Sequence, residues 1–309
     1  MVSGHGTRAV VAALLANLGI AVAKFVGFLV TGSSALLAES VHSGADSGNQ
    51  GLLLLGIKRA RRDASSTHPF GYARARYVWS FVVALMLFVL GSLFSLYEGA
   101  QKLRHPHELV SPLVAVGILV AAIGLETWSF RTAIREANAL RSGRSWWAFI
   151  RGTKQPEVPV VLLEDLGALV GMVLALVGVG LAIVTGDARF DALGTLAIGV
   201  LLGVIAGLLA WEMHSLLIGE AAAAEDTAAI IAAMESEPGV RRLLEVKTQH
   251  LGPDELLVAA KVELDPNLTF AQVVEVIDAA ERRVREDVPE ATALYVEPDV
   301  GVAGGRGSD

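Results

Sequence analysis

The stretch Leu37-Ala-Glu-Ser-Val-His-Ser-Gly-Ala-Asp-Ser-Gly-Asn-Gln50 carries a row of polar residues, and an apolar run follows it directly. Four polar residues in it are spaced three, four and three residues apart, so a helix places them on one face: Glu39, His42, Asp46 and Asn49. Such a row in a bilayer-spanning helix is costly and usually marks an ion or proton pathway. His42 and Asp46, one turn apart, suit a divalent metal. The alternative interpretation is a polar kink packed against neighbouring helices.

The composition of the chain indicates a membrane protein. Of its 309 residues, 53% are hydrophobic and 18% are charged, which is too apolar for a soluble domain. The absence of cysteine excludes disulfides and thiolate ligands. The net charge is −7, and residues 220–309 hold 19 acidic and 8 basic residues. An acidic C-terminal part therefore follows a mildly basic apolar part, and nothing in this pattern indicates nucleic-acid binding.

Six apolar stretches each reach the roughly 20 residues that cross a bilayer. They cover residues 8–31, 35–57, 75–98, 109–130, 158–185 and 191–218. We therefore predict an all-α bundle of six transmembrane helices in residues 1–219. The first stretch contains Asn17 and Lys24 and no small-residue cleavage pattern, so it is not expected to be a cleaved signal peptide.

Loop charges predict the orientation of these helices. Two loops carry most of the basic residues: Lys58, Arg59, Arg61, Arg62, Arg74 and Arg76 in one, and Arg131, Arg135, Arg141, Arg144, Arg151 and Lys154 in the other. Because positive loops stay on the cytoplasmic side, both termini are expected there. No organellar targeting sequence precedes the first stretch, which favours a bacterial inner membrane.

After Gly219 the pattern is that of a soluble domain. Residues 224–236 and a segment with apolar residues from Phe270 to Val284 have helical spacing, whereas 241–251, 255–264 and 292–296 read as strands. This αββαβ order predicts a two-layer α+β domain over residues 220–300. The tail 301–309 is expected to be disordered.

A second acidic feature lies early in the fifth apolar stretch, where Glu164 and Asp165 are adjacent. Two carboxylates there call for a cation, a proton or a partner base. Adjacent helical residues point about 100° apart, so one is expected to bind an ion directly. We favour Asp165 as the ligand, with Glu164 as a supporting group, proton carrier or alternate ligand. The alternative is a structural pair bonded to Ser or Asn side chains.

These features resemble the cation diffusion facilitator family over almost the whole chain. The resemblance is carried by Thr31 to Asp46, by His68-Pro-Phe-Gly-Tyr72, by Asp191-Ala-Leu193 and by the C-terminal αββαβ unit, which is similar to the family's ferredoxin-like cytoplasmic domain. Ser40 to Gly51 with Leu162-Leu-Glu-Asp165 resembles the zinc transporter nine branch more narrowly.

The resemblance implies a homodimeric exporter that exchanges a divalent metal for protons. His42, Asp46 and Asp165 fall on ligand positions of the second and fifth helices. The remaining position, commonly His in the family, is Val161 here. Glu164, Glu39, Asn49 or water would fill that vacancy, and more oxygen ligands favour manganese, iron or cobalt beside zinc. Nickel and cadmium are further possible cargoes, and no resident cofactor is expected.

Two accessory metal sites of the family look eroded. A second histidine found in some members is replaced by Tyr72, so His68 is interpreted mainly as a turn residue with a possible metal role. Tyr295 replaces another family histidine, and His250 is expected to be a surface group. Glu126 and Asn17 either line the path or form interhelical hydrogen bonds, the second being favoured for Asn17.

Three functions compete for this pattern. The leading hypothesis is a metal/proton antiporter working by alternating access. An intramembrane metallohydrolase is disfavoured because His-Glu-x-x-His and Gly-x-Ser-x-Gly are absent from the sequence, so the chain is not expected to be an enzyme. The third is a transport-inactive metal-binding or scaffold protein that dimerises through its C-terminal domain, and Val161 is its only support.

Overall fold

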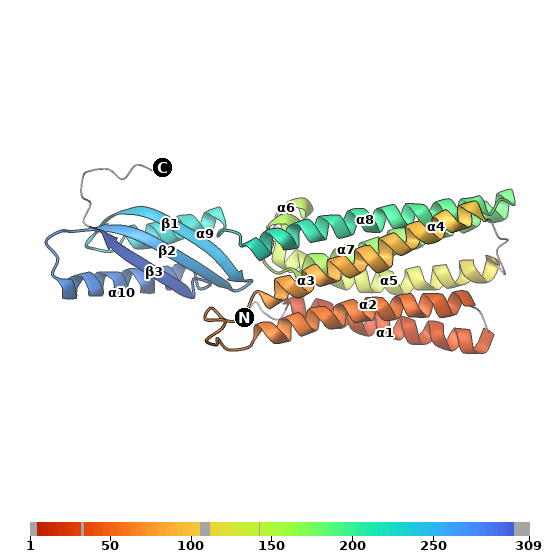
Figure 1. Cartoon of the computed structure of the whole chain (residues 1–309), viewed down its shortest axis with the longest axis horizontal. Helices are drawn as coiled ribbons and strands as arrows, with labels where there is room; N and C mark the ends of the chain where they lie inside the picture. The colour runs from red at the N-terminus through yellow and green to blue at the C-terminus, as the bar shows by residue number, and fades with distance from the viewer. Residues whose placement is uncertain (1–4, 32–33, 106–111, 142, 300–309) are drawn as a thin grey trace. The chain divides into compact units, whose positions relative to one another are not determined.

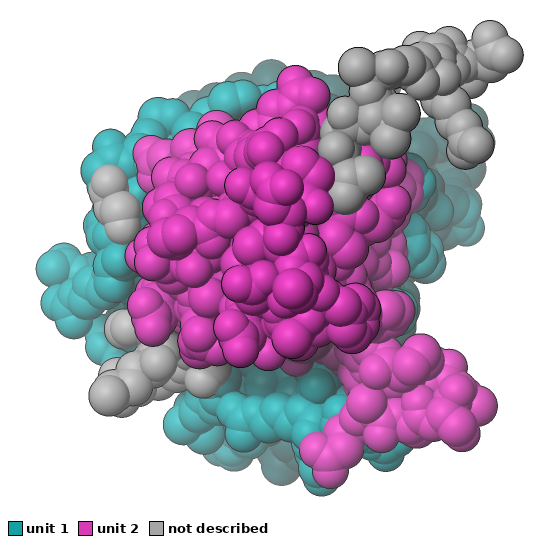
Figure 2. Space-filling view, turned by 90° about the vertical axis from the view of Figure 1, so that its left-hand side faces the viewer, with its two compact units in different colours: residues 1–62, 75–214 teal, residues 63–74, 215–309 magenta. Residues whose placement is uncertain are grey.

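The computed structural model describes residues 5–31, 34–105, 112–141 and 143–299 (Figure 1). The chain forms two compact units (Figure 2), which we call the helical unit (residues 1–62 and 75–214) and the C-terminal unit (residues 63–74 and 215–309). The expected disordered tail lies outside the described residues. So do the side chains of Glu39, His42 and several other residues of the first two helices.

Long helices build the helical unit (Figure 1). They are α1 (His5–Thr31), α2 (Ser34–Ala60), α5 (Pro112–Arg141), α7 (Glu157–Thr185), α8 (Arg189–Ile218) and a continuous segment of α3 (Ala75–Met86), π-helical η2 (Leu87–Leu93) and α4 (Phe94–Arg104). Within the described ranges, four helices are long and apolar enough to cross a membrane: Ala75–Arg104, Val116–Arg141, Glu157–Thr185 and Arg189–Ile218. The predicted all-α transmembrane bundle is confirmed, but of the six expected spans the first two, α1 and α2, do not meet this criterion over their described residues.

The segment between the fourth and fifth apolar stretches is more helical than expected. α5 continues beyond residue 130 to Arg141, because Ala133 and Ala137 keep one face of it buried. The short helix α6 (Trp146–Gly152) then begins at Ser145, whose hydroxyl accepts a hydrogen bond from the Ala148 N–H. It buries Phe149. Hydrophobicity alone did not predict this segment, because its apolar residues are interrupted by arginines.

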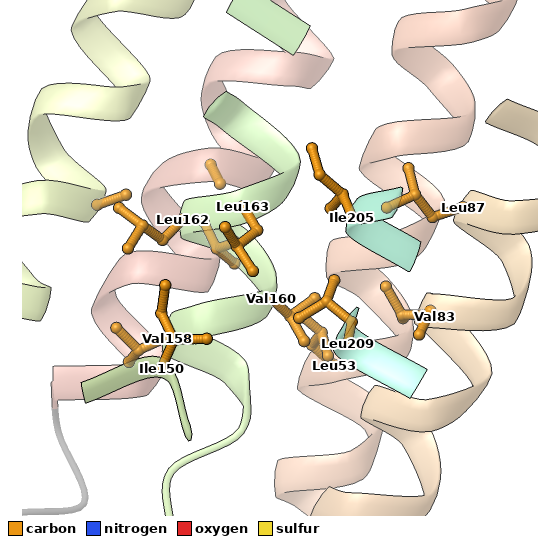
Figure 3. Packing of buried hydrophobic residues seen from close by; sticks show 14 of the residues in the cluster. Leu53, Val83, Leu87, Ile150, Val158, Val160, Leu162, Leu163, Ile205 and Leu209 are labelled. Atoms are coloured by element: carbon orange, nitrogen blue, oxygen red, sulfur yellow. The ribbon is translucent and has the colours of Figure 1, made fainter. Parts of the chain in front are cut away.

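A core of apolar side chains in the helical unit includes the residues directly before the acidic pair of α7. Leu53 of α2, Val83 of α3, Val160 of α7 and Leu209 of α8 belong to this buried cluster (Figure 3). In α7 every residue from 157 to 165 is buried. Glu164 and Asp165 therefore follow directly on the apolar core, away from bulk water.

Small residues allow close backbone contact between two helices of this unit. A Cβ on Gly178 of α7 would lie 3.0 Å from the carbonyl oxygen of Phe190, and one on Gly194 of α8 would lie 3.1 Å from that of Leu174. In η2, the Ser92 hydroxyl donates a 2.8 Å hydrogen bond to the carbonyl oxygen of Gly199 in α8. Such contacts replace the hydrophobic driving force that lipid does not supply between helices.

The C-terminal unit has one sheet and two helices, α9 (Ala224–Glu235) and α10 (Phe270–Asp287). The strands β1 (Val240–Gly252), β2 (Glu255–Leu264) and β3 (Ala293–Asp299) lie in the order β1-β2-β3. β1 and β2 are antiparallel, and β3 is parallel to β2. Alternate residues of β2, from Leu256 to Leu264, are buried with side chains of both helices. The predicted αββαβ domain is confirmed.

Candidate metal site

The polar row of α2 is helical, as its spacing predicts. Asp46 is half-buried and Asn49 is buried. The side chains of Glu39 and His42 lie outside the described residues, so their predicted metal contacts stay predictions. Asp46 is thus the described member of the row that carries a charge.

Glu164 of α7 faces α1 and α2 through a chain of amide groups. Its Oε1 accepts a 2.9 Å hydrogen bond from Asn49 Nδ2, and its Oε2 accepts a 3.1 Å bond from Gln50 Nε2. Asn17 Nδ2 of α1 in turn donates to Gln50 Oε1 at 3.4 Å. Both oxygens of Glu164 are therefore held by neutral donors, and the expected interhelical hydrogen bond of Asn17 is present.

Asp165 faces a different neighbour, as adjacent helical residues must. Its Oδ2 accepts a 3.0 Å hydrogen bond from the Ser129 hydroxyl of α5. Its Oδ1 is buried without a hydrogen-bond partner, and the whole residue is only 1% exposed. A buried carboxylate oxygen without a donor is costly, so Asp165 retains a free coordination position that Glu164 lacks.

The described charges around this pair are acidic. Asp46 and Glu126 interact electrostatically with both Glu164 and Asp165, and Glu126 is itself buried. Carboxylates from α2, α5 and α7 thus act on one another in a low-dielectric interior, where repulsion is stronger than in water. Protons or a cation relieve such repulsion.

The described side chains do not by themselves complete a metal site. Among them, no group of three or more His, Asp or Glu residues is placed to hold one ion. Val161, at the position where the family commonly has histidine, is buried in the apolar core. The alternative of a structural pair bonded to Ser or Asn accounts for one oxygen of Glu164, held by Asn49, and for one of Asp165, held by Ser129, whereas Gln50 holds the other oxygen of Glu164.

A second buried charge in α7 is paired, in contrast. Glu157, in the first turn, forms a two-point ion pair with Arg76 of α3, with Nε–Oε1 at 2.5 Å and Nη2–Oε2 at 2.8 Å. Arg76 had been counted among the loop charges, but it lies in α3 and is buried. Its guanidinium matches the carboxylate geometry.

The accessory histidines lie in the C-terminal unit. His68 is exposed in a short hydrogen-bonded turn, where its Nδ1 lies 3.1 Å from Thr67 Oγ1 and its ring lies against Tyr72. His250 was expected at the surface, and this prediction is wrong. It is buried near the end of β1. Its backbone N–H donates a hydrogen bond to the carbonyl oxygen of Glu220.

Sequence reasoning missed two of the groups that hold the acidic pair. Gln50 lies beside the polar row, and its only signal was an amide at the start of an apolar run. Ser129 could not be recognised from the sequence, because serine is common in transmembrane helices, where its hydroxyl often bonds to the backbone. The roles of both residues depend on contacts between segments that are distant in sequence, and local spacing does not reveal such contacts.

Comparison with known proteins gives the family. The profile of the cation efflux transmembrane domain matches residues 10–218, and that of the cation efflux protein cytoplasmic domain matches residues 222–299. These matches define the class as integral membrane transporters and not enzymes. The chain belongs to the cation efflux, or cation diffusion facilitator, family, and its resemblance to the zinc transporter nine-like branch is confirmed.

The relatives include proteins from eukaryotes and bacteria. The human mitochondrial proton-coupled zinc antiporter SLC30A9 is 32% identical over 82% of this chain, which spans 45% of that protein's length. The cation-efflux pump FieF of Klebsiella pneumoniae is 27% identical over 93% of this chain and 91% of its own. Among solved structures, a MamM CTD is 24% identical, covers 24% of this chain and 89% of its own, and has a TM-score of 0.23.

Proposed function

We propose that this protein exports a divalent metal cation from the cytoplasm in exchange for protons. The observation that carries the proposal is Asp165, a carboxylate 99% buried in an apolar bundle with one oxygen that has no hydrogen-bond partner. An acid in that position is explained by an ion that it binds and releases. The names of relatives, a proton-coupled zinc antiporter and a cation-efflux pump, support the same activity.

The ligands we propose are His42, Asp46 and Asp165. Because Asn49 and Gln50 occupy both oxygens of Glu164, Glu164 acts first as the group that fixes α7 against α2, and as an alternate ligand when those amides release it. The side-chain oxygens of Glu39 and Asn49, also on α2, are further possible metal ligands. His68, exposed on its turn, is the least supported candidate.

Zinc is the foremost cargo because the relative SLC30A9 is named a zinc antiporter, and manganese, iron, cobalt, nickel and cadmium are the alternatives. One imidazole with several carboxylates gives an oxygen-rich site, and such sites bind hard cations more readily than thiolate or multi-histidine sites do.

Protons take the place of the metal at the same groups. A carboxylate or imidazole must be deprotonated to bind a metal, so binding releases protons and release of the metal takes them up. A site that alternates between the two occupants is the minimum required for antiport. We further propose alternating access of helices α2 and α7, a homodimer, residues 1–219 and 220–300 as the functional domains, cytoplasmic termini and a bacterial inner membrane.

Uptake into proteoliposomes with an imposed pH gradient tests this function. Zinc, manganese, cobalt, nickel, iron and cadmium are offered to the wild type, Asp46→Asn and Asp165→Asn, with the exposed Asp187→Asn as matched control. We expect uptake of at least one ion, a loss of about a hundredfold in both site variants, and no change in the control. Folded wild-type protein that moves none of these ions, with or without the gradient, contradicts the proposal.

The second candidate function is a transport-inactive scaffold. The apolar, buried Val161 favours it, since a histidine ligand is missing there. A scaffold would dimerise and bind partners but show no uptake of any ion in the same assay.

A further inference from the structure

One face of α5 is buried, and the spacing of its buried residues shows which residues lie on that face. The buried residues of the described helix follow at intervals of three or four: Ala122, Glu126, Ser129, Ala133 and Ala137. Small residues on such a face let a neighbouring helix approach closely. Glu126 is the charged residue in this stripe, with an exposed fraction of 7%.

A hydrogen bond fixes the neighbour that this face meets. Ser129, one turn from Glu126, donates to Asp165 Oδ2 of α7 at 3.0 Å. Residues three apart lie on the same side of a helix, so Glu126 is on the α5 face that meets Asp165. The electrostatic interaction of Glu126 with both Asp165 and Glu164 agrees with this placement.

Asp165 supplies independent evidence for a ligand between the two helices. Its Oδ1 is buried without a partner, although Ser129 satisfies the other oxygen from α5. Glu126 and Asp165 are both buried and interact electrostatically, and two carboxylates repel more strongly in a low-dielectric interior than in water. A divalent cation between them removes this repulsion and gives the unpaired oxygen a partner.

We propose that Glu126 is a further ligand of the transported ion, so that α5 joins α2 and α7 in forming the site when the ion draws together carboxylates that are not grouped around one point in the described structure. The inference rests on the proposed function and deepens it. Glu126 supplies an oxygen ligand that compensates for the apolar Val161. A site with two histidines is the reference. When a carboxylate replaces one of the two imidazoles, the preference of the site shifts from zinc toward manganese or cobalt.

Metal binding by the full-length protein tests the role of Glu126 separately from transport. Titration calorimetry with Mn²⁺ and Zn²⁺, and the visible absorption of bound Co²⁺, compare wild type with Glu126→Gln. Glu136→Gln is the matched control, because Glu136 lies on the same helix outside the buried stripe. We expect Mn²⁺ affinity to fall at least about tenfold, Zn²⁺ affinity to fall less, and the Co²⁺ spectrum to change.

The outcomes separate the two proposals. If Asp165→Asn abolishes binding while Glu126→Gln binds all three ions as the wild type does, Glu126 is not a ligand and the proposed function stands. If the wild type binds none of them, the proposed function fails, and this inference with it. Should Glu126→Gln not fold, Glu126→Asp keeps the charge but retracts the carboxylate by one methylene, and an unchanged Co²⁺ spectrum overturns the inference.

Discussion

The two units of this protein balance their acidic side chains in opposite ways. In the C-terminal unit, described carboxylates pair with cations at the surface. Lys261, for example, lies 3.1 Å from Glu297 and 3.0 Å from Asp299. In the helical unit, the hydrogen bonds of Glu164 and Asp165 come from amide and hydroxyl groups, which orient a carboxylate but do not cancel its charge.

The difference shows where compensating charge must come from. In the C-terminal unit, the chain itself supplies the counter-charge of these carboxylates. The described neighbours of the acidic pair of α7 are carboxylates, amides and a hydroxyl, and under the proposed function a metal ion or protons neutralise the pair. Glu157, about two turns earlier in the same helix, is the internal reference, because Arg76 neutralises it permanently.

Removing the cation from that reference pair is expected to have the largest effect. Arg76→Ala leaves Glu157 buried without a counter-charge, which costs about 3–5 kcal/mol of the free energy of unfolding. Thermal unfolding in detergent measures the loss. Arg59→Ala, which removes a stacking contact with Trp79, is the matched control and should cost about 0.5–1 kcal/mol. Equal losses in the two variants would contradict the comparison between paired and unpaired acids.

Loosening the acidic pair without removing its charge is expected to have an intermediate effect. Gln50→Ala takes away one donor to Glu164 and the link to Asn17, so the carboxylate is no longer fixed against α2. Metal affinity should fall about tenfold, as it does when supporting groups of a metal site are lost. Calorimetric titration measures it, and Gln101→Ala, at the end of α4, serves as control. Unchanged affinity would show that the amides are structural only.

Disrupting an ion pair in the C-terminal unit is expected to have the smallest effect. Hydrogen bonds to Asp299 and Glu297 raise the pKa of Lys261 above its usual 10.5. Because this pKa is higher in the folded state, the stabilisation is complete below the unfolded pKa and is lost as pH rises through the folded one. Lys261→Met should therefore lower the unfolding temperature only slightly at neutral pH, and not at all at strongly alkaline pH or in high salt. A large loss at neutral pH would show that these pairs matter as much as buried ones.

Sequence patterns predicted the elements well and their contacts poorly. Helical spacing placed Asp46 and Asn49 on α2, and two adjacent acids in an apolar run marked Glu164 and Asp165, because period and burial cost are local properties. The partners of those acids were not predictable. Ser129 and Gln50 come from helices 36 and 114 residues away in sequence, and a pairing at that distance depends on how the helices rotate against each other. The same applies to Arg76 with Glu157 and to the buried position of His250.

The backbone contact at Gly178 and Gly194 has a geometric consequence for the metal site. The backbones of α7 and α8 approach each other closely there, so a tilt of α7 about this contact moves its other end the most. Asp165 lies thirteen residues before Gly178, about 20 Å along the helix axis. A tilt of about 10° at the glycines therefore displaces the carboxylate by about 3 Å, the full length of a hydrogen bond. Under the proposed function, a small change of angle at one end of α7 is sufficient to open or close the coordination of an ion at the other.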